Sequence, residues 1–396
     1  MTMTCRYFPD CRGCDNWLRT DEEQKKNKLD DLTQRLQLAH LPFEKINYTL
    51  IQSQQLRHRF DFTISLNPTT PDSPVTPIFQ LGLYDRHRNI IDLEECLQLS
   101  PELQKIFSEF RTITQQMHWN NPQAPRIKKG SARLRVGPSG LKGLWLDFAN
   151  QDIKNLLEDG LWIKQLIKAG FCLEIGQKGK SVQIMEQQLK LAQPEIKTWF
   201  NTSNYLDEAQ PIQGLISDFT QPSWLSGQAL VRVINSWIKK IKTHQTISTL
   251  NRKPVALEFG PGLGPFTLPL LSWGFSVHAY EFQQRLAQGL QHNARLNHLE
   301  QDLHLHVGDF QNQTLPEAFP AEMILVNPPR SGLKQFTQSI IQRRARFCFY
   351  ISCFPESMVE DLKPLTAAGY RIKELSIIDQ FPKTNHYETC AFLEIE

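Results

Sequence analysis

Several features are missing from this sequence, and each absence narrows the class of protein. No uninterrupted apolar run reaches the roughly 18 residues that span a bilayer. A secretory leader is not expected either, because Arg6, Asp10, Arg12 and Asp15 interrupt the N-terminal stretch and no apolar segment follows it. We therefore expect a cytoplasmic protein without a membrane partner.

A strong excess of charge is also missing. The formal net charge is +3, with 21% charged and 40% hydrophobic residues, which is typical of an ordinary globular chain. This balance permits a nucleic-acid partner without requiring one, because positive charge can be concentrated locally. The length of 396 residues predicts two or three domains.

Cysteine is present, and its placement is informative. Of the 8 cysteines, Cys5, Cys11 and Cys14 lie in the short stretch "CRYFPDCRGC". In the reducing cytoplasm, clustered cysteines are more often metal ligands or catalytic thiols than disulfides. The cluster predicts a metal site whose fourth ligand lies elsewhere in the chain.

The N-terminal half mixes helices and strands. Thr20 and Glu23 form a capping-box pattern at the start of a helix predicted over 20–40. Strict alternation over 59–67 predicts a strand, and a second alternating stretch after a turn-rich loop predicts its hairpin partner. A further helix is predicted over 102–119, where apolar residues form one stripe.

From about residue 215 the pattern changes to short apolar strands alternating with helices. This pattern predicts a mostly parallel sheet covered on both faces. Ligands in such sheets bind beyond the carboxyl ends of the strands. The predicted strands are 254–259, 276–282, 303–310, 321–329 and 346–352.

The first of these strands leads into the loop Gly260, Gly262 and Gly264, which allows close approach of a ligand to the backbone. A dinucleotide fingerprint would continue with a further glycine, but Pro265 follows, so a nicotinamide cofactor is disfavoured. Glu281 ends the next strand, where a carboxylate can accept hydrogen bonds from both ribose hydroxyls of an adenosine-containing cofactor.

Polar residues end the third and fourth strands as well. Asp309 would lie near an adenine, although a solvated loop carboxylate is an equally good interpretation. Asn327 opens "NPPRSG" and can present its amide toward a reacting base. The position that is aromatic in amino-directed methyltransferases is Arg330, which favours a different chemistry. Together these residues indicate S-adenosylmethionine.

The fifth strand delivers Cys353 to the same edge of the sheet. A thiolate before a helix is favoured by the helix N-terminus, so Cys353 is a candidate nucleophile, with a buried structural thiol as the alternative. Cys348 lies inside the strand and is expected to be core. Glu388 stands in an apolar hairpin, either as a general base or as an edge charge.

Six motifs, in their order along the chain, resemble the RNA 5-methyluridine methyltransferase family. They are "DFTQPS", "LEFGPGLGPF", "YEF", "LVNPPRSG", "YISCFPESM" and "DQFPKTNHYE". The resemblance implies an α/β protein with a C-terminal Rossmann-like methyltransferase domain and an N-terminal α+β RNA-recognition region that carries a metal-cluster site. The expected regions are a cluster-bearing segment over 1–96, a central RNA-recognition region over 97–205 and the methyltransferase domain over 206–396.

The resemblance also implies roles for individual residues. Cys353 would attack carbon 6 of uracil, and Glu388 would remove the proton from carbon 5. The positions assigned to S-adenosylmethionine are Gln221, Gly260, Glu281 and Asn327. Cys96 would be the fourth ligand of a [4Fe–4S] cluster, although a structural zinc would use the same four thiolates.

The substrate implied by the resemblance is RNA, and the compact branch that acts on 23S ribosomal RNA is the most similar. Methylation of tRNA and a non-catalytic RNA-binding role are the alternatives, and a monomer is expected. Candidate phosphate contacts lie in two basic stretches, although such runs are often only solvated surface. They are Arg126, Lys128, Lys129, Arg133 and Arg135, and Arg57, His58 and Arg59.

Overall fold

The computed structural model describes residues 4–66, 79–117, 127–149, 151, 153–158, 160–200, 212–309 and 321–396, apart from the side chains of residues 127, 128, 155 and 158. The chain groups into two compact units. Unit 1 comprises Met1–Trp17, Ser53–Asn201 and Gly214–Trp224, and unit 2 comprises Leu18–Gln52, Thr202–Gln213 and Leu225–Glu396. These units cut across the three consecutive regions expected from the sequence, because residues 18–52 join the C-terminal part of the chain.

Unit 2 is built on an eight-stranded sheet in the order β1-β17-β18-β16-β15-β12-β13-β14. The five strands predicted from the sequence are β12 to β16, and they pair in parallel. The last strand, β18, is antiparallel to both of its neighbours, β16 and β17. The strands are β1 (Ile46–Leu50), β12 (Val255–Phe259), β13 (Ser276–Glu281), β14 (Leu303–Val307), β15 (Met323–Val326), β16 (Phe347–Ser352), β17 (Arg371–Asp379) and β18 (Glu388–Glu394).

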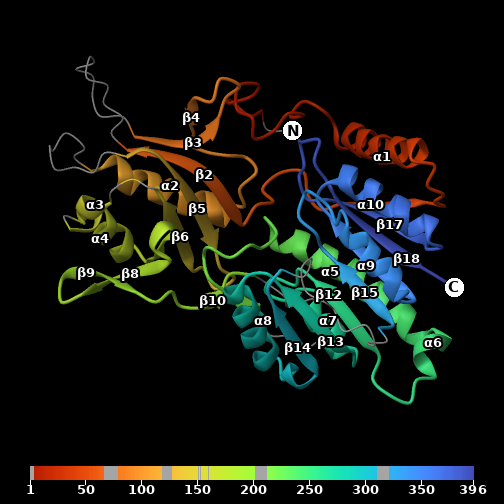
Figure 1. Cartoon of the computed structure of the whole chain (residues 1–396). Helices are drawn as coiled ribbons and strands as arrows, with labels where there is room; N and C mark the ends of the chain where they lie inside the picture. The colour runs from red at the N-terminus through yellow and green to blue at the C-terminus, as the bar shows by residue number, and fades with distance from the viewer. Residues whose placement is uncertain are drawn as a thin grey trace. The chain divides into compact units, whose positions relative to one another are not determined.

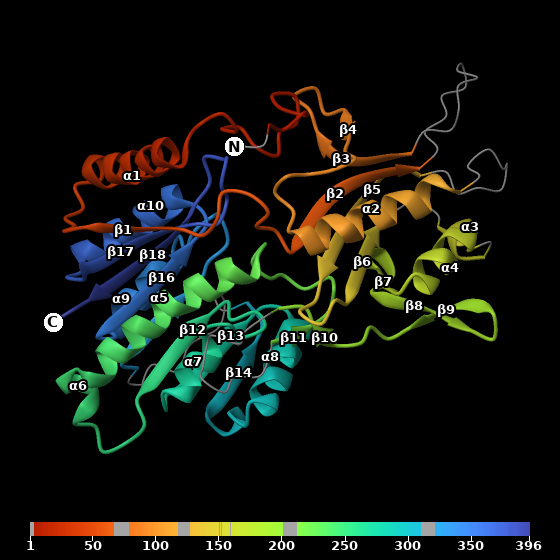
Figure 2. The ribbon, with the colours of Figure 1, turned by 180° about the vertical axis from the view of Figure 1, so that it is seen from behind.

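Helices cover both faces of this sheet (Figures 1 and 2). On one face α1, α9 and α10 bury a continuous core against the strands. On the other, Trp237 of α5 packs on Phe349 and Phe392. The helices are α1 (Asp21–Leu38), α5 (Trp224–Thr243), α6 (Gln245–Ser248), α7 (Thr267–Ser272), α8 (Gln284–Leu296), α9 (Phe336–Arg343) and α10 (Pro355–Ala367).

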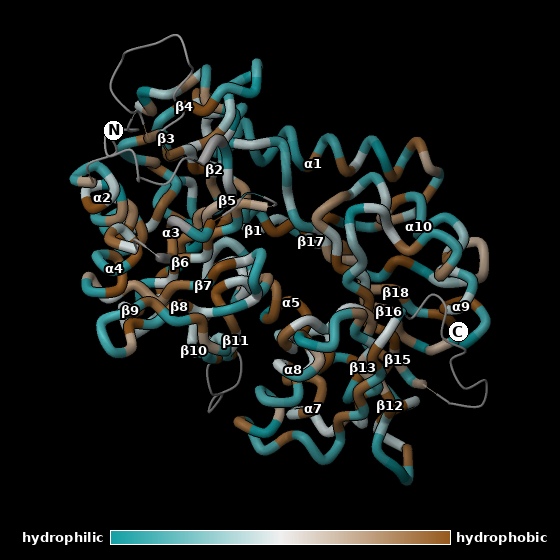
Figure 3. The backbone as a smooth tube through the Cα atoms, turned by 60° about the vertical axis from the view of Figure 1, so that its left-hand side comes forward, coloured by the Kyte–Doolittle hydropathy of each residue, from teal (hydrophilic) through white to brown (hydrophobic). Residues whose placement is uncertain are grey.

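The parallel strands are apolar along their whole length because both faces are covered. Every residue of β12, β15 and β16 is buried, and Figure 3 shows these strands mainly in brown. Such continuous runs are typical of a sheet enclosed by helices. The same burial makes any acidic residue inside these strands unusual.

Helix α1 confirms the capping box read from the sequence. The Glu23 N–H donates to the Thr20 hydroxyl at 3.2 Å, and the Thr20 N–H donates to the Glu23 carboxylate at 2.7 Å. Leu32 and Leu36 are fully buried in the core of unit 2, and Arg35 pairs with Glu356 of α10 at 2.8 Å. The helix ends at Leu38, close to the predicted end.

Unit 1 holds a second eight-stranded sheet, in the order β4-β3-β2-β5-β6-β7-β8-β9. Its pairs are antiparallel except β6 with β7. The predicted hairpin is confirmed as β2 and β3, while its loop lies outside the described residues. The strands are β2 (Arg59–Leu66), β3 (Gln80–Tyr84), β4 (Ile90–Asp92), β5 (Ile127–Val136), β6 (Lys142–Asp147), β7 (Phe171–Ile175), β8 (Lys180–Met185) and β9 (Gln188–Ala192). Two short strands follow, β10 (Lys197–Thr198) and β11 (Gln213–Gly214).

One face of this sheet is covered by α2 (Pro101–Gln115), α3 (Lys154–Glu158) and α4 (Leu161–Lys168). The alternation read from the sequence is confirmed, since Phe60, Phe62 and Ile64 are buried in that core. Helix α2 ends before the predicted residue 119, and residues 118–126 lie outside the description. Among the described helices, none is long and apolar enough to cross a membrane.

Candidate active site

In unit 2 the polar residues named by the sequence lie at the carboxyl ends of the parallel strands. The loop after β12 places Gly260, Gly262 and Gly264 at φ of 78°, 59° and 94°, where side chains other than glycine are strained. A Cβ on Gly260 would lie 3.0 Å from the backbone oxygen of Asn327, whereas a Cβ on Gly262 would meet no atom within 4 Å. The loop therefore leaves open space beside its backbone.

Glu281 closes one side of this loop. Its carboxylate accepts the N–H of Gly262 at 3.1 Å and the N–H of Gln283 at 2.9 Å. These bonds hold the carboxylate in place and still leave lone pairs for further donors. Asn327 follows β15 and its N–H donates to Phe259, while Asp309 lies two residues beyond the end of β14.

Glu258, the residue before the last one of β12, lies directly before the glycine loop and was not among the residues predicted from the sequence. Its side chain is fully buried, and its Oε2 accepts the Thr267 hydroxyl at 2.6 Å. Its Oε1 has no hydrogen-bond partner among the described residues. Burial raises the pKa of Glu258 to about 8, with Thr267 opposing that shift and Glu281 adding to it. The signal was available, because Glu258 is an acid inside an otherwise apolar strand.

These features fit S-adenosylmethionine. The open glycine loop admits a ligand against the backbone, and Glu281 can accept ribose hydroxyls. The unpartnered buried oxygen of Glu258 can accept a hydrogen bond from an ammonium group. The cofactor chemistry inferred from sequence therefore agrees with the donor groups that surround the loop.

The same edge of the sheet brings Cys353 and Glu388 together. Ser352 of β16 pairs with Thr389 of β18, so the next residues outward, Cys353 and Glu388, stand at facing strand ends. Glu388 is 3% exposed, and Cys353 is half-buried just before α10. Their proximity makes a nucleophile and base pair chemically reasonable.

Burial, not the helix N-terminus, is the largest influence on the pKa of the Cys353 thiol. It raises the pKa of Cys353, and the Glu388 carboxylate raises it further. The favourable influence of the helix N-terminus, expected from the sequence, is therefore opposed by burial. The largest influence that lowers the pKa is the guanidinium of Arg330, which hydrogen-bonds to the thiol, and a backbone hydrogen bond at Cys353 lowers it as well. Cys348 is fully buried, which confirms it as core.

Glu388 is another buried carboxyl of unit 2 without a cationic partner. Burial raises its pKa to about 8, and among the described residues the group that opposes this shift is the Gln380 side chain. The Gln380 amide donates to Glu388 Oε2 at 2.7 Å. A carboxyl whose pKa lies near neutrality is suited to proton transfer.

In unit 1 the four cysteines of the expected metal site line one cavity of about 70 Å³. The Gly13 N–H donates to the Cys11 sulfur at 3.4 Å. Burial raises the pKa of Cys14 to about 12, with Cys96 as the next cause. As they stand, no three His, Cys, Asp or Glu side chains in the described ranges are grouped to hold a single metal ion. The cysteines are Cys5, Cys11, Cys14 and Cys96.

Gln221 lies in unit 1. Arginine side chains fix the residues just before it by hydrogen bonds to their backbone carbonyl groups. Arg133 donates to the carbonyl of Ser217 at 2.8 Å, and Arg59 and Arg135 donate to the carbonyls of Thr220 and Asp218. The buried Glu174 carboxylate accepts the N–H groups of Ile216 and Ser217 at 2.8 and 3.1 Å. The segment that resembles the family motif is therefore fixed from several sides.

These contacts correct the expected phosphate-binding residues. Arg135 is 1% exposed, and Arg59 and Arg133 both pair with Asp61, so these three are structural and not free for phosphate. His58 stacks on Trp224 with ring centroids 3.9 Å apart. Lys129 is exposed and stays a candidate, whereas Arg126 and the Lys128 side chain lie outside the described residues.

Comparisons with known proteins agree with this chemistry. The family model for tRNA (uracil-5-)-methyltransferase matches residues 310–396. An uncharacterised RNA methyltransferase of Bdellovibrio bacteriovorus is 37% identical over 100% of this chain and 96% of its own length. A 23S rRNA (uracil(1939)-C(5))-methyltransferase of Marinomonas posidonica is 24% identical over 98% of this chain and 80% of its own length.

One solved structure shares the fold. The tRNA (uracil-54, C5)-methyltransferase of Pyrococcus abyssi, in complex with S-adenosyl-L-homocysteine, has a TM-score of 0.64 and 17% identity, and the match covers 97% of this chain and 86% of that one. Together with the 37% identical relative, these findings establish the assignment. The chain belongs to the family of S-adenosylmethionine-dependent RNA (uracil-5-)-methyltransferases.

Proposed function

We propose that this enzyme methylates carbon 5 of a specific uridine in 23S ribosomal RNA through a covalent adduct with Cys353. The observation that carries the proposal is the pairing of Cys353 and Glu388 at facing strand ends, with Arg330 bonded to the thiol. The choice of 23S RNA rests on relatives of that name at 24% and 25% identity over nearly the whole chain.

Each residue has a defined task in this mechanism. Carbon 5 of uracil is a weak nucleophile, so the Cys353 thiolate first adds to carbon 6, and the electrons of the 5,6 double bond move to the oxygen on carbon 4. Arg330 favours the thiolate that makes this bond. Carbon 5 then takes the electrophilic methyl group that S-adenosylmethionine supplies when bound.

Glu388 completes the cycle. It removes the proton from carbon 5, the double bond reforms, and the sulfur–carbon bond breaks to release the thiolate. The cofactor would be held by Gln221, Gly260, Gly262, Gly264, Glu258, Glu281, Asp309 and Asn327. Because both reacting side chains are wholly or partly buried, the target uridine must leave its stack to reach them.

The decisive experiment uses RNA that carries 5-fluorouridine at the target position. Fluorine cannot leave as a proton does, so the methylated adduct is expected to be trapped on the wild-type enzyme and absent from Cys353→Ala. Transcripts of 23S RNA and of tRNA are compared as substrates. Methylation of uridine by Cys353→Ala would overturn the mechanism, and a preference for tRNA would overturn the proposed substrate.

We also propose that Cys5, Cys11, Cys14 and Cys96 hold a [4Fe–4S] cluster. The four thiols share one cavity, and the Gly13 N–H that bonds Cys11 is the kind of donor that surrounds cluster sulfurs. A single zinc would need its sulfurs about 3.8 Å apart, from tetrahedral geometry and a Zn–S length of about 2.3 Å. Zinc is the alternative occupant of the same four thiols, and metal analysis distinguishes it from the cluster.

Metal analysis tests this second proposal. Protein purified without oxygen is expected to be brown and to contain about four irons per chain. Cys96→Ser is expected to lose the colour, whereas Cys172→Ser, in the same unit but outside the cavity, is expected to keep it. Colourless protein with one zinc per chain would contradict the cluster.

A further inference from the structure

We infer that Gln380 is a positioning residue for the reaction, which sets the orientation and the protonation of the Glu388 carboxyl. The inference deepens the proposed function and rests on Glu388 being the base. The two side chains are 0% and 3% exposed, and the Gln380 amide donates to Glu388 Oε2 at 2.7 Å. Among the described residues, no other side chain donates a hydrogen bond to that carboxyl.

The second observation is the other end of the amide. Gln380 Oε1 is buried and has no hydrogen-bond partner among the residues that the structure describes. An unsatisfied buried acceptor is costly and rare in folded proteins. The amide cannot turn this oxygen toward the carboxylate without giving up the N–H bond, so the fold accepts an unpaired oxygen to keep a donor on Glu388.

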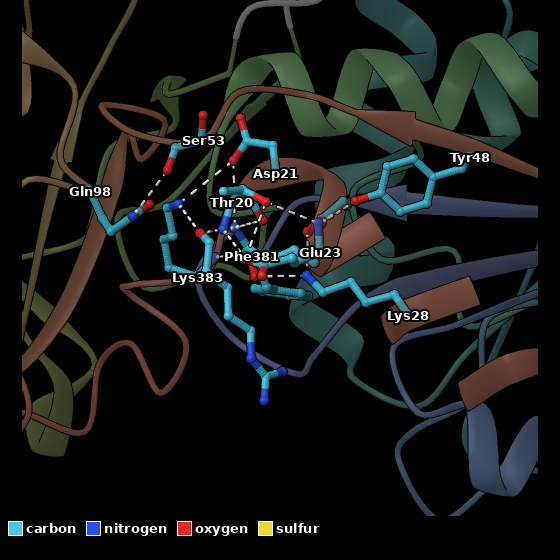
Figure 4. Close-up of polar contacts among 12 residues, drawn as sticks. Thr20, Asp21, Glu23, Lys28, Tyr48, Ser53, Gln98, Phe381 and Lys383 are labelled. Atoms are coloured by element: carbon cyan, nitrogen blue, oxygen red, sulfur yellow. Dashed lines mark hydrogen bonds and ion pairs between the residues drawn. The ribbon is translucent and has the colours of Figure 1, made fainter. Parts of the chain in front are cut away.

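The loop that carries Gln380 is itself rigidly held. Its neighbour Asp379 accepts one hydrogen bond from the buried amine of Lys28 at 2.7 Å and another from the hydroxyl of Tyr48 at 2.6 Å. Figure 4 labels these two donors, Lys28 and Tyr48. Farther along, the Lys383 N–H donates to the side chain of Gln24 in α1 at 2.6 Å. Helix α1 and strand β1 therefore fix both sides of Gln380, which leaves the amide little freedom to move.

The Gln380 hydrogen bond keeps the pKa of Glu388 close to the pH at which this carboxyl must accept a proton. Burial stabilises the neutral form of Glu388, whereas a proton acceptor must be ionised near the working pH. The Gln380 N–H favours the ionised form and opposes burial. The other titratable groups that face this carboxyl are Cys353 at the end of β16 and Cys390 on β18, and Arg330 reaches Cys353.

The test compares Gln380→Met, which keeps the volume but removes the amide, with wild-type enzyme in single-turnover methylation across pH. Breakdown of the adduct should require ionised Glu388. Removing the Gln380 N–H raises the pKa of this carboxyl, so the pH of half-maximal breakdown is expected to rise by about one unit. At high pH the variant should recover most of the wild-type rate. Gln380→Asn, whose shorter amide no longer reaches, serves as the second variant if the first does not fold.

Tyr370→Phe is the matched control. It removes a buried hydrogen bond, from the Tyr370 hydroxyl to the carbonyl of Ala345, just before the opposite end of β17, so it is expected to lower thermal stability without moving the pH midpoint. An unchanged midpoint in both Gln380 variants would overturn the inference while leaving Glu388 as the base. Glu388→Gln that releases methylated RNA at the wild-type rate would overturn the proposed base itself, so the two failures are distinct.

Discussion

Two groups of buried charges, one in each unit, show opposite arrangements. In unit 1 the arginines Arg59 and Arg133 share Asp61, and Arg135 lies beside them with its guanidinium on a backbone carbonyl. In unit 2 the carboxyls of Glu258 and Glu388 lie buried without a cation, each holding one polar side chain. Paired charges keep a segment in place, whereas isolated carboxyls acquire the raised pKa values that chemistry at neutral pH requires.

Burial alone therefore does not identify a functional residue. Arg135 and Glu388 are both almost fully buried, yet the first donates to the backbone carbonyl of Asp218 and the second faces the Cys353 thiol. The difference lies in what surrounds each charge. A buried group that lacks a counter-ion and stands at a strand end is the better candidate for catalysis.

The largest expected effect tests the isolated carboxyl at the reaction centre. Glu388→Gln should lower steady-state methylation by about a thousand-fold, because general base catalysis contributes roughly that much. Attack by Cys353 and methyl transfer should persist, so an adduct with ordinary RNA should accumulate on denaturing gels. If Glu388→Gln turned over at the wild-type rate and no adduct accumulated, Glu388 would not be the base, and its isolation would have no catalytic meaning.

A second effect concerns stability and has a defined sign. Glu258 has a folded-state pKa of about 8, above its ordinary value, so its contribution to stability is full below the unfolded pKa and is lost as the pH rises toward 8. Glu258→Gln should therefore be more stable than wild type at pH 8, by at most about 5 kcal/mol, and equal to it near pH 4. Hydrogen exchange of β12 measures this, and binding of S-adenosylmethionine should weaken.

The corresponding change in unit 1 should have the opposite sign. Asp61→Asn leaves Arg59, Arg133 and Arg135 close together without their shared carboxylate, and it should destabilise unit 1 by about 1–2 kcal/mol. The loss should be visible as faster exchange in β2 and β5 at neutral pH. If Asp61→Asn proves neutral while Glu258→Gln is destabilising at pH 8, the comparison fails.

The smallest effect separates surface charge from structural charge within unit 1. Lys129 is exposed with its amine 5.0 Å from the centre of the Tyr84 ring, so Lys129→Ala should weaken RNA binding slightly and reduce its salt slope by about 1. Lys190→Ala, which breaks the pair with Glu186, is the control and should leave the slope unchanged. If both variants show the same salt dependence of RNA binding, Lys129 does not contact phosphate and is only solvated surface.

Much of the catalytic unit was readable from the sequence because its signals are local. Apolar strands ending in Gly260, Glu281, Asn327 and Cys353 predict where a parallel sheet collects its ligands, and the structure confirms these strand ends. The capping box at Thr20 is equally local. Arg135 was misread as a surface residue, because a strand's sequence does not tell which neighbours its arginines will meet.

The sequence by itself predicted the parallel strands β12 to β16, the helix that follows Thr20 and the reaction family, since these depend on short motifs and on periodicity. Only the tertiary structure decided that residues 18–52 join unit 2, that Glu388 lies opposite Cys353, and that Gln380 holds its carboxyl. The reason is physical. Strand register and burial bring residues from distant parts of the chain together, and these contacts, which no local pattern records, set the orientation and the pKa of each buried group.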